Sequence, residues 1–204
     1  MQGDPGSPLH PQTKRHLHNS QRLRAAAIRE FARHGLHGTK VSNIVAAAQL
    51  TQPSFYRTWP SKEAAFEQIV SETLRSWREA ATRIMAGPRT LPLRPRMEQG
   101  LSRLYTLLVE DLELTHMVLR EDLKNADRYL PFIDIYTQVF LEAQAHRLII
   151  QTPAETLAQA YTAITDRLFY ARLYTQECSV GDTVQEAMSL LLPLFHPLPP
   201  KETP

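Results

Sequence analysis

Apolar residues recur three and four positions apart along most of the chain, and this spacing constrains the fold more than any other feature of the sequence. It places apolar side chains on one face of an α-helix. No segment shows the sustained two-residue alternation of a half-buried strand. With 43% apolar residues among 204, the chain can bury a substantial core. We therefore expect an all-α protein of about nine helices.

The expected helices are separated by residues that stop helices or start them. Gly35, Pro60, the Gly87-Pro88 pair and the Pro-rich stretch 91–95 interrupt the pattern. Thr39, Thr51 and Ser61 can cap the second, third and fourth helices. These signals predict helices over residues 23–35, 41–48, 51–59, 61–85, 101–112, 114–118, 131–143, 153–177 and 180–195.

Charge is distributed unevenly, although the net charge is only +2. Residues 14–63 contain nine Lys or Arg but only two acids, so this segment carries +7 and the remainder −5. Such asymmetry is typical of a basic module that binds a polyanion, joined to a module that does not. A merely solvated basic surface is the alternative on composition alone.

The second and third expected helices are short and are separated by a tight turn at Gln49-Leu50, as in a DNA-binding helix-turn-helix. At the start of the third helix, Gln52, Pro53 and Ser54 have the side chains that read base edges. Four polar residues further along suit phosphates: Tyr56, Arg57, Thr58 and Lys62. Phe55 and Trp59 share the opposite face, which we assign to the core rather than to base stacking.

One set of residues between Leu23 and about Val70 forms a recognisable pattern: Leu23, Ala26, Ala27, Phe31, Gly35, Thr39, Val41, Ile44, Ala48, Tyr56 and the run Trp59-Pro60-Ser61-Lys62-Glu63-Ala64. With these residues the segment resembles the DNA-binding domain of the TetR family of transcriptional regulators. The resemblance implies a homodimeric repressor with three N-terminal helices on DNA, a fourth helix leading to a helical ligand-binding domain, and two last helices that pair across the dimer.

Position by position, the resemblance places Gln52, Pro53, Ser54 and Arg57 toward the groove, with Tyr56 and Lys62 on phosphates. Ser42 matches a position that reaches a base or the backbone. Thr39 and Lys40, just before the second helix, complete the expected phosphate-binding set.

The chain departs from the family pattern at three of its positions. Gln49 replaces a turn glycine, which predicts strain if that backbone is left-handed. Thr58 stands where an aromatic or His commonly contacts phosphate, and Lys40 replaces a Ser or Thr.

Catalytic and cofactor sites find little support in the sequence, so we expect no enzyme, cofactor or metal. Glu113 and His116 have di-iron spacing, but a second such pair is missing. Glu142 and His146 lie one turn apart without the second histidine of a metalloprotease helix. Cys178 is the single cysteine and is interpreted as an inert thiol.

Large or polarisable residues on the later helices are the candidates for an effector pocket, which the resemblance implies. Arg167 is the most informative, because a charge in a helix expected to be largely buried needs a partner or an acidic ligand. The candidates are Trp77, Tyr105, Met117, Phe132, Tyr136, Phe140, Arg167 and Tyr170.

Together these patterns predict four regions: a disordered extension over residues 1–14, a DNA-binding domain over 15–62, a ligand-binding and dimerisation domain over 63–196, and a disordered Pro-rich tail over 197–204. The predicted function is a cytoplasmic dimeric repressor that binds a palindromic DNA operator and is released by a small apolar ligand. No membrane span is expected. A helical adaptor, or a nucleic-acid-binding protein without small-molecule sensing, is the alternative.

Overall fold

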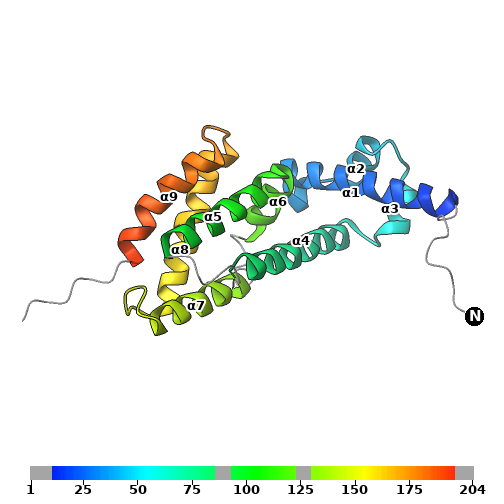
Figure 1. The fold of residues 1–204 in the computed structure, drawn as a ribbon. Coiled ribbons are helices and arrows are strands. Elements are labelled where there is room, and N and C mark those ends of the chain that lie inside the picture. The colour runs from blue at the N-terminus through cyan, green and yellow to red at the C-terminus, as the bar shows by residue number, and fades with distance from the viewer. Residues whose placement is uncertain (1–10, 86–92, 123–129, 196–204) are drawn as a thin grey trace, which may run out of the picture. The chain divides into compact units, whose positions relative to one another are not determined.

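The computed structural model describes residues 11–85, 93–122 and 130–195, and every element within these ranges is helical (Figure 1). The expected all-α fold is confirmed. The elements are α1 Pro11–Gly38, α2 Val41–Ala47, α3 Gln52–Thr58, α4 Lys62–Met85, α5 Leu93–Val109, α6 Leu112–Asp122, α7 Leu130–Ala145, α8 Ala154–Leu168, the π-helix η2 Phe169–Tyr174, and α9 Val180–Phe195.

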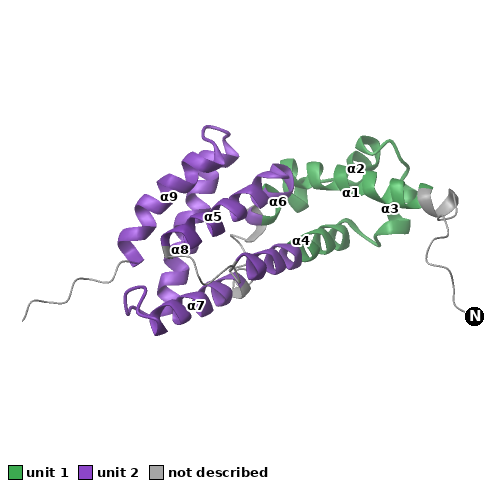
Figure 2. Ribbon diagram, viewed as in Figure 1, with its two compact units in different colours: residues 1–73, 116–118 green, residues 74–115, 119–204 purple. Residues whose placement is uncertain are grey.

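The chain divides into two compact units, and the division falls inside α4 rather than before it (Figure 2). Unit 1 comprises residues 1–73 with 116–118, and unit 2 comprises residues 74–115 with 119–204. We had expected the boundary at residues 62 and 63. The structure moves it later because the first three turns of α4 pack into the core of unit 1, where Ala65, Phe66, Ile69 and Val70 are buried.

Unit 1 has a core built from one apolar face of each of its helices. Phe31 of α1 meets Phe66 of α4 edge to face, with ring centroids 5.1 Å apart. Ile44 of α2 and Phe55 of α3 are fully buried in the same unit. Arg24 of α1 also donates a hydrogen bond to Glu72 of α4 over 3.0 Å. The four helices are thus held together mainly by apolar packing, and the Arg24–Glu72 ion pair adds a polar contact between α1 and α4.

The last turns of α1 are kinked at Gly35, which adopts φ 68° and ψ 177°. A positive φ of this kind favours glycine, because a side chain would be strained there. Gly35 was expected to end the helix, and the helical conformation is indeed interrupted there; a short stretch that ends at Gly38 follows the kink. At the other end, α1 begins at Pro11, so residues 11–14 are helical and not disordered as expected. Residues 1–10 and the predicted tail over 197–204 lie outside the described residues.

Helix α4 begins as the sequence predicted. The Ser61 hydroxyl accepts a hydrogen bond from the Ala64 backbone N–H over 3.1 Å, which is the geometry of an N-cap. Glu63 lies in the first turn, where the helix dipole favours an acid. Such a cap stabilises a helix by about 1 kcal/mol.

In unit 2, α5 begins at Leu93, earlier than predicted. Pro95 therefore lies in its first turn, where the missing backbone N–H has no intrahelical acceptor to lose. We had interpreted the Pro-rich stretch as a break, but it also contains the start of a helix. The predicted short helix after α5 is confirmed as α6, whose first turn is capped by Asp111 accepting from the Leu114 N–H over 2.9 Å.

The predicted long helix over 153–177 is only partly correct. Regular α-helix ends at Leu168 and is followed by one turn of π-helix, Phe169–Tyr174. Such turns are rare and recur at functional sites. Helix α9 has the predicted bounds and packs against both α5 and α8, while α7 packs against α8.

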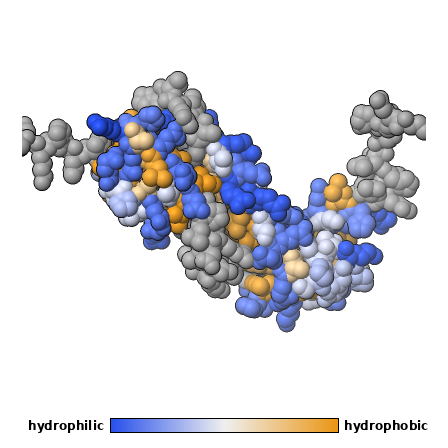
Figure 3. Space-filling model, turned by 90° about the horizontal axis from the view of Figure 1, so that it is seen from below, coloured by the Kyte–Doolittle hydropathy of each residue, from blue (hydrophilic) through white to orange (hydrophobic). Residues whose placement is uncertain are grey.

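The apolar faces of α8 and α9 are already covered within the protomer. The resemblance implied that the two last helices pair across the dimer, but the residues of these apolar faces are buried in the core of unit 2: Leu157, Tyr161, Leu168, Val184, Ala187, Met188 and Leu191. The apolar residues of α9 that are exposed lie elsewhere on the helix, at Leu190 and Leu194. On the face seen in Figure 3, apolar side chains of unit 2 lie exposed among hydrophilic ones.

Candidate nucleic-acid interface

Helix α3 is held in unit 1 by two buried aromatic side chains. Phe55 is 0% exposed and Trp59 is 4% exposed, and their ring centroids lie 5.3 Å apart. The Trp59 indole N–H donates to the Gln68 side chain of α4 over 3.0 Å, so its one polar atom is satisfied. The prediction that both rings belong to the core is confirmed.

The opposite side of α3 is exposed and polar. Gln52, Pro53 and Arg57 are exposed, and Tyr56 keeps 53% of its surface in solvent. Short polar side chains and a planar guanidinium are the groups that read base edges in a major groove. The structure therefore leaves Gln52, Pro53 and Arg57 exposed together on one short helix, with Ser54 half-buried among them.

Ser54 connects these side chains through its hydroxyl. Its Oγ accepts a hydrogen bond from the Arg57 guanidinium over 2.9 Å and lies 3.2 Å from the Thr51 hydroxyl. Thr51 does occupy the N-cap position, but its side chain makes no capping bond to the backbone of α3. The expected Thr51 cap is thus replaced by hydrogen bonds that link the side chains of Thr51, Ser54 and Arg57. These bonds hold the Arg57 guanidinium near the start of the helix.

The turn between α2 and α3 is strained in the way that the sequence predicted. Gln49 has φ 52°, in the left-handed region that the usual glycine would occupy without cost. Its side-chain oxygen accepts a hydrogen bond from Arg22 of α1 over 3.2 Å. The turn closes through the Leu50 N–H, which donates to the Val45 carbonyl over 2.8 Å.

Some of the residues expected to contact phosphates have exposed side chains, and others have side chains that are already hydrogen-bonded within the protein. Tyr56 and Lys40 are exposed, and so is Ser42 on α2. The Thr58 hydroxyl donates to the Ser54 carbonyl over 3.3 Å, which ties it to its own helix.

Thr39 differs from the exposed candidates because its side chain is buried, at 1% exposure. Its hydroxyl lies 2.7 Å from the Gly35 carbonyl and 3.0 Å from the Glu30 carbonyl. Thr39 is also not the cap of α2, since Lys40 occupies that position without a side-chain capping bond. A buried hydroxyl cannot reach DNA, so we remove Thr39 from the phosphate-binding set.

Lys62 has its ammonium group turned toward the end of α1. Its Nζ lies 2.9 Å from the Leu36 carbonyl, 3.3 Å from that of His37 and 2.9 Å from that of Thr39. This arrangement was not apparent from the sequence, where Lys62 was expected to contact a phosphate. The sequence signal that could have revealed it is the glycine at position 35, because a kink there leaves backbone carbonyls without their helical donors.

Three of the candidate effector-binding residues come together in the core of unit 2. Tyr136 and Phe140 of α7 both pack on Tyr161 of α8, with ring centroids 4.7 Å and 5.9 Å apart. Tyr105 of α5 joins them at α8 through its hydroxyl, which donates to the Thr165 carbonyl over 3.0 Å. We call Tyr105, Tyr136, Phe140 and Tyr161 the tyrosine cluster. The sequence pattern did not single out Tyr161 as a candidate.

The tyrosine cluster places three phenol groups in a low-dielectric interior. Burial raises the pKa of Tyr105, Tyr136 and Tyr161 well above the ordinary value, because the phenolate would lose its hydration. The negative charge of Asp166 on α8 adds to the effect at all three rings. The three side chains therefore stay neutral and can donate hydrogen bonds.

The other effector candidates do not join this cluster. Trp77 is buried in unit 2, whereas Met117 is buried in unit 1. Phe132 and Tyr170 are half-buried. Arg167 is exposed, so the expectation that α8 buries it was wrong: residue 167 falls on the side of the helix away from Leu168 and Tyr161.

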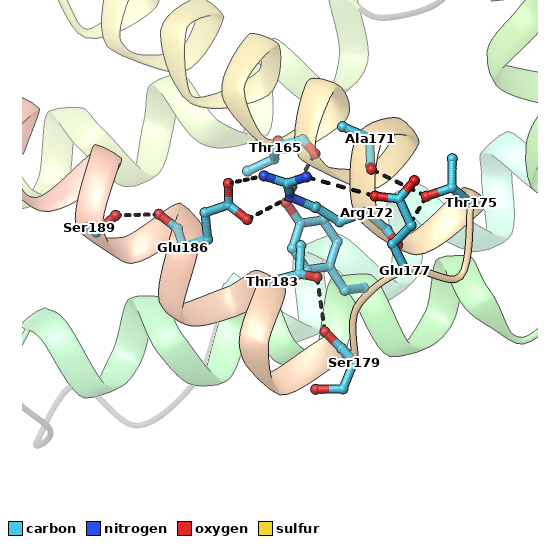
Figure 4. Close-up of polar contacts among 10 residues, drawn as sticks. Thr165, Ala171, Arg172, Thr175, Glu177, Ser179, Thr183, Glu186 and Ser189 are labelled. Atoms are coloured by element: carbon cyan, nitrogen blue, oxygen red, sulfur yellow. Dashed lines mark hydrogen bonds and ion pairs between the residues drawn. The ribbon is translucent and has the colours of Figure 1, made fainter.

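A further polar contact joins the π-helix to α9 (Figure 4). The Arg172 guanidinium donates two hydrogen bonds to the Glu186 carboxylate, over 2.9 Å and 3.0 Å, and lies 3.9 Å from Glu177. Hydrogen bonding by Arg172 lowers the pKa of the Glu186 carboxyl. The pair is partly exposed, so it orients the two elements more than it stabilises them.

Two classes of feature are absent from the described part of the chain. Within residues 11–85, 93–122 and 130–195, no group of three or more His, Cys, Asp or Glu side chains could hold a metal ion. Over the same ranges, no helix combines the length and the apolar composition that a membrane crossing requires.

Comparison with known proteins matches the segment that carries α1 to α4. Residues 23–69 match the family described as bacterial regulatory proteins, tetR family. Over 180 residues, the chain is 26% identical to the uncharacterized HTH-type transcriptional regulator YdgC of Bacillus subtilis, a match that covers 86% of this chain and 92% of that protein.

Solved structures share the fold over most of the chain. A tetR-family regulatory protein from Rhodococcus RHA1 superposes with a TM-score of 0.72 at 19% identity, covering 87% of this chain and 97% of that one. The transcriptional regulator FadR from Bacillus subtilis, in complex with stearoyl-CoA, superposes with a TM-score of 0.67 at 14% identity, covering 87% and 100%. At these identities the likeness concerns the fold alone.

Proposed function

Because the chain belongs to the TetR family of transcriptional regulators, we propose that it acts in the cytoplasm as a homodimeric repressor, binding a palindromic operator and leaving it when a small apolar effector binds. The observation that carries this proposal is the exposed polar face of α3 over its buried Phe55 and Trp59. A short, firmly seated helix with such a face fits a major groove.

In this proposal the contacts to DNA divide by their place on α2 and α3. Gln52, Pro53, Ser54 and Arg57 read bases, since they lie on or beside the exposed face of α3. Ser42 and Lys40, exposed around the start of α2, and the exposed Tyr56 contact the backbone. Thr58 contributes little, because its hydroxyl is bonded within α3.

The proposed dimer uses a surface other than the one that the sequence indicated. Leu190 and Leu194 lie one turn apart on α9 and are 49% and 40% exposed. Exposed leucines at this spacing suit a helix-to-helix contact with a second copy. Replacing both with Asp should give a monomer in sedimentation velocity, whereas Gln185→Asp, at an exposed polar position of α9, should leave the dimer intact. A wild-type monomer at micromolar concentration would rule out the dimer.

The effector is proposed to act on the tyrosine cluster in unit 2. Its aromatic rings offer apolar contact, and its neutral hydroxyls offer hydrogen bonds to a polar head group. Effector binding would favour a dimer whose two recognition helices no longer match major grooves about 34 Å apart. Stearoyl-CoA is the first probe, since FadR of similar fold binds it. It should release DNA from the wild type and fail to do so from Tyr136→Ala, with coenzyme A alone as the control.

DNA binding is tested by fluorescence anisotropy. A duplex enriched from a random library by the wild-type protein, here called the selected duplex, is compared with a random duplex at several salt concentrations. The proposal expects tighter binding to the selected duplex and affinity that falls with salt. Gln52→Ala should relax preference at one base position only. Equal affinity for both duplexes, or affinity independent of salt, would favour the adaptor alternative.

A further inference from the structure

Lys62 connects three backbone carbonyls that belong to different parts of unit 1. Two of them, from Leu36 and His37, lie in the last turn of α1, and the third, from Thr39, lies just before α2. An ammonium group has three N–H donors. All three are matched by these carbonyls, so a phosphate could be contacted only by breaking one of the bonds.

The carbonyls at this end of α1 need an external donor. The last four carbonyls of a helix have no intrahelical partner, and they carry the negative end of the helix dipole. The left-handed backbone of Gly35 interrupts the helical bonding further. The Thr39 hydroxyl serves the Gly35 carbonyl, and Lys62 serves the carbonyls that follow. A cation is the favourable group for this position.

The same contact holds the first residue of α4 against the segment that joins α1 to α2, where the helix-turn-helix begins. Lys62 is the first residue of α4, whose start is also held by the Ser61 cap. Thr39 directly precedes the N-cap of α2, and α3 packs against both α1 and α2. A shift of the start of α4 should therefore displace the backbone at Thr39, and with it α2 and α3, which follow directly in the chain.

We propose that Lys62 is a positioning residue, which couples α4 to the orientation of α3 through the carbonyls of Leu36, His37 and Thr39 and makes no phosphate contact. This inference rests on the proposed DNA-binding function. A displacement of α4 would be transmitted to the recognition helix α3 through the Lys62 ammonium group. Removing this ammonium group should reduce the preference for one DNA sequence over another, rather than the affinity of the protein for DNA of any sequence.

The test compares Lys62→Met with Lys40→Met, which removes an exposed cation from the same unit. Lys62→Met should weaken binding to the selected duplex about tenfold and binding to the random duplex less than about twofold, with an unchanged slope of log affinity against log salt. Lys40→Met should weaken both duplexes alike and reduce the slope by about 0.9 for each phosphate that the lysine neutralises. Binding is measured well below the unfolding temperature of each variant.

Lys62→Gln separates the two roles further, because an amide donates hydrogen bonds without carrying charge. It should recover part of the preference that Lys62→Met loses and keep the wild-type salt slope. A salt slope reduced in Lys62→Gln and Lys62→Met, with both duplexes weakened alike, would overturn the inference in favour of a phosphate contact.

Thermal unfolding tests the inference even if the wild type binds no DNA and the proposed function fails. Lys62→Met should lower the unfolding temperature by about 2–8 °C, since three carbonyls lose their donor, while Lys40→Met should leave it unchanged. An unfolding temperature unaffected by Lys62→Met would show that the carbonyl contacts carry no energy and would overturn the inference on its own.

Discussion

Tyr56 in unit 1 and Tyr105 in unit 2 show how differently the two units use the same side chain. Tyr56 keeps 53% of its surface exposed on α3, whereas Tyr105 is 0% exposed and donates its hydroxyl proton to the Thr165 carbonyl. Unit 1 keeps its polar recognition groups outside an apolar core. Unit 2 places polar groups inside the core, where each needs a partner and a neutral charge state.

This contrast indicates which substitutions separate function from stability. Changing an exposed polar residue of α3 should alter DNA binding and leave the fold intact, because its hydroxyl or amide already contacts water. Changing a polar residue of the tyrosine cluster should alter stability as well, because the group left behind is desolvated.

Phe55→Ala should have the largest effect, because it empties a fully buried site under the exposed face of α3. We expect the free energy of unfolding to fall by about 3–5 kcal/mol, together with loss of DNA binding. Tyr56→Ala, one residue away but exposed, should cost less than about 1 kcal/mol. Urea unfolding followed by circular dichroism measures both. Equal losses for the two variants would contradict the division of α3 into a buried and an exposed side.

Alkaline pH should destabilise the protein through the tyrosine cluster. The pKa of all three buried tyrosines is raised above the ordinary 10.0, so the folded state retains protons that the unfolded state releases. Their stabilising contribution is therefore complete below pH 10.0 and is lost as the pH rises toward their folded-state values. Each tyrosine adds about 1.4 kcal/mol of loss per pH unit in that range.

Urea unfolding at pH 9 and pH 11 measures this dependence. Because lysines titrate in the same range, the informative quantity is the difference between wild type and Tyr161→Phe, whose slope should be smaller by one tyrosine. Tyr56→Phe is the matched control, because it removes a hydroxyl from an exposed side chain outside the tyrosine cluster. A slope that is unchanged in Tyr161→Phe would mean that the cluster is open to water.

Tyr105→Phe should have the smallest of the three effects. It removes one buried hydrogen-bond donor and leaves the Thr165 carbonyl without that partner, at a cost of about 1–3 kcal/mol. The same change at Tyr56 should cost less than about 0.5 kcal/mol, because water hydrates that exposed position in either variant. Calorimetry at pH 7 compares the two. If Tyr56→Phe proved the more destabilising, the contrast between the units would fail.

Much of unit 1 was predictable because its signals are local. The four-residue spacing of Phe55 and Trp59, the Ser61 cap and the left-handed turn at Gln49 each depend on a few neighbouring residues, and all three predictions are confirmed. The base-reading residues follow from the same short pattern and stay a prediction. Helix periodicity also predicted the bounds of α9.

The sequence did not indicate the contacts between residues far apart along the chain. One of them joins the Lys62 ammonium group to carbonyls 23 to 26 residues earlier. Thr39 was expected to cap α2 and to contact a phosphate, but its hydroxyl is buried against the carbonyls of Glu30 and Gly35. Arg167 was expected to be buried, but it is exposed. The expectation failed because the sequence does not show which side of α8 the neighbouring elements cover.

The sequence alone specifies that the chain is helical, where most helices begin and end, and which short helix presents a polar face. These properties depend on backbone hydrogen bonds and side-chain spacing within a few turns. What covers each apolar face, and which donor meets each carbonyl, depend on the tertiary structure. An amphipathic helix specifies that one side must be buried but not which element buries it. The covered faces of α8 and α9 and the three carbonyls at Lys62 therefore follow only from the fold.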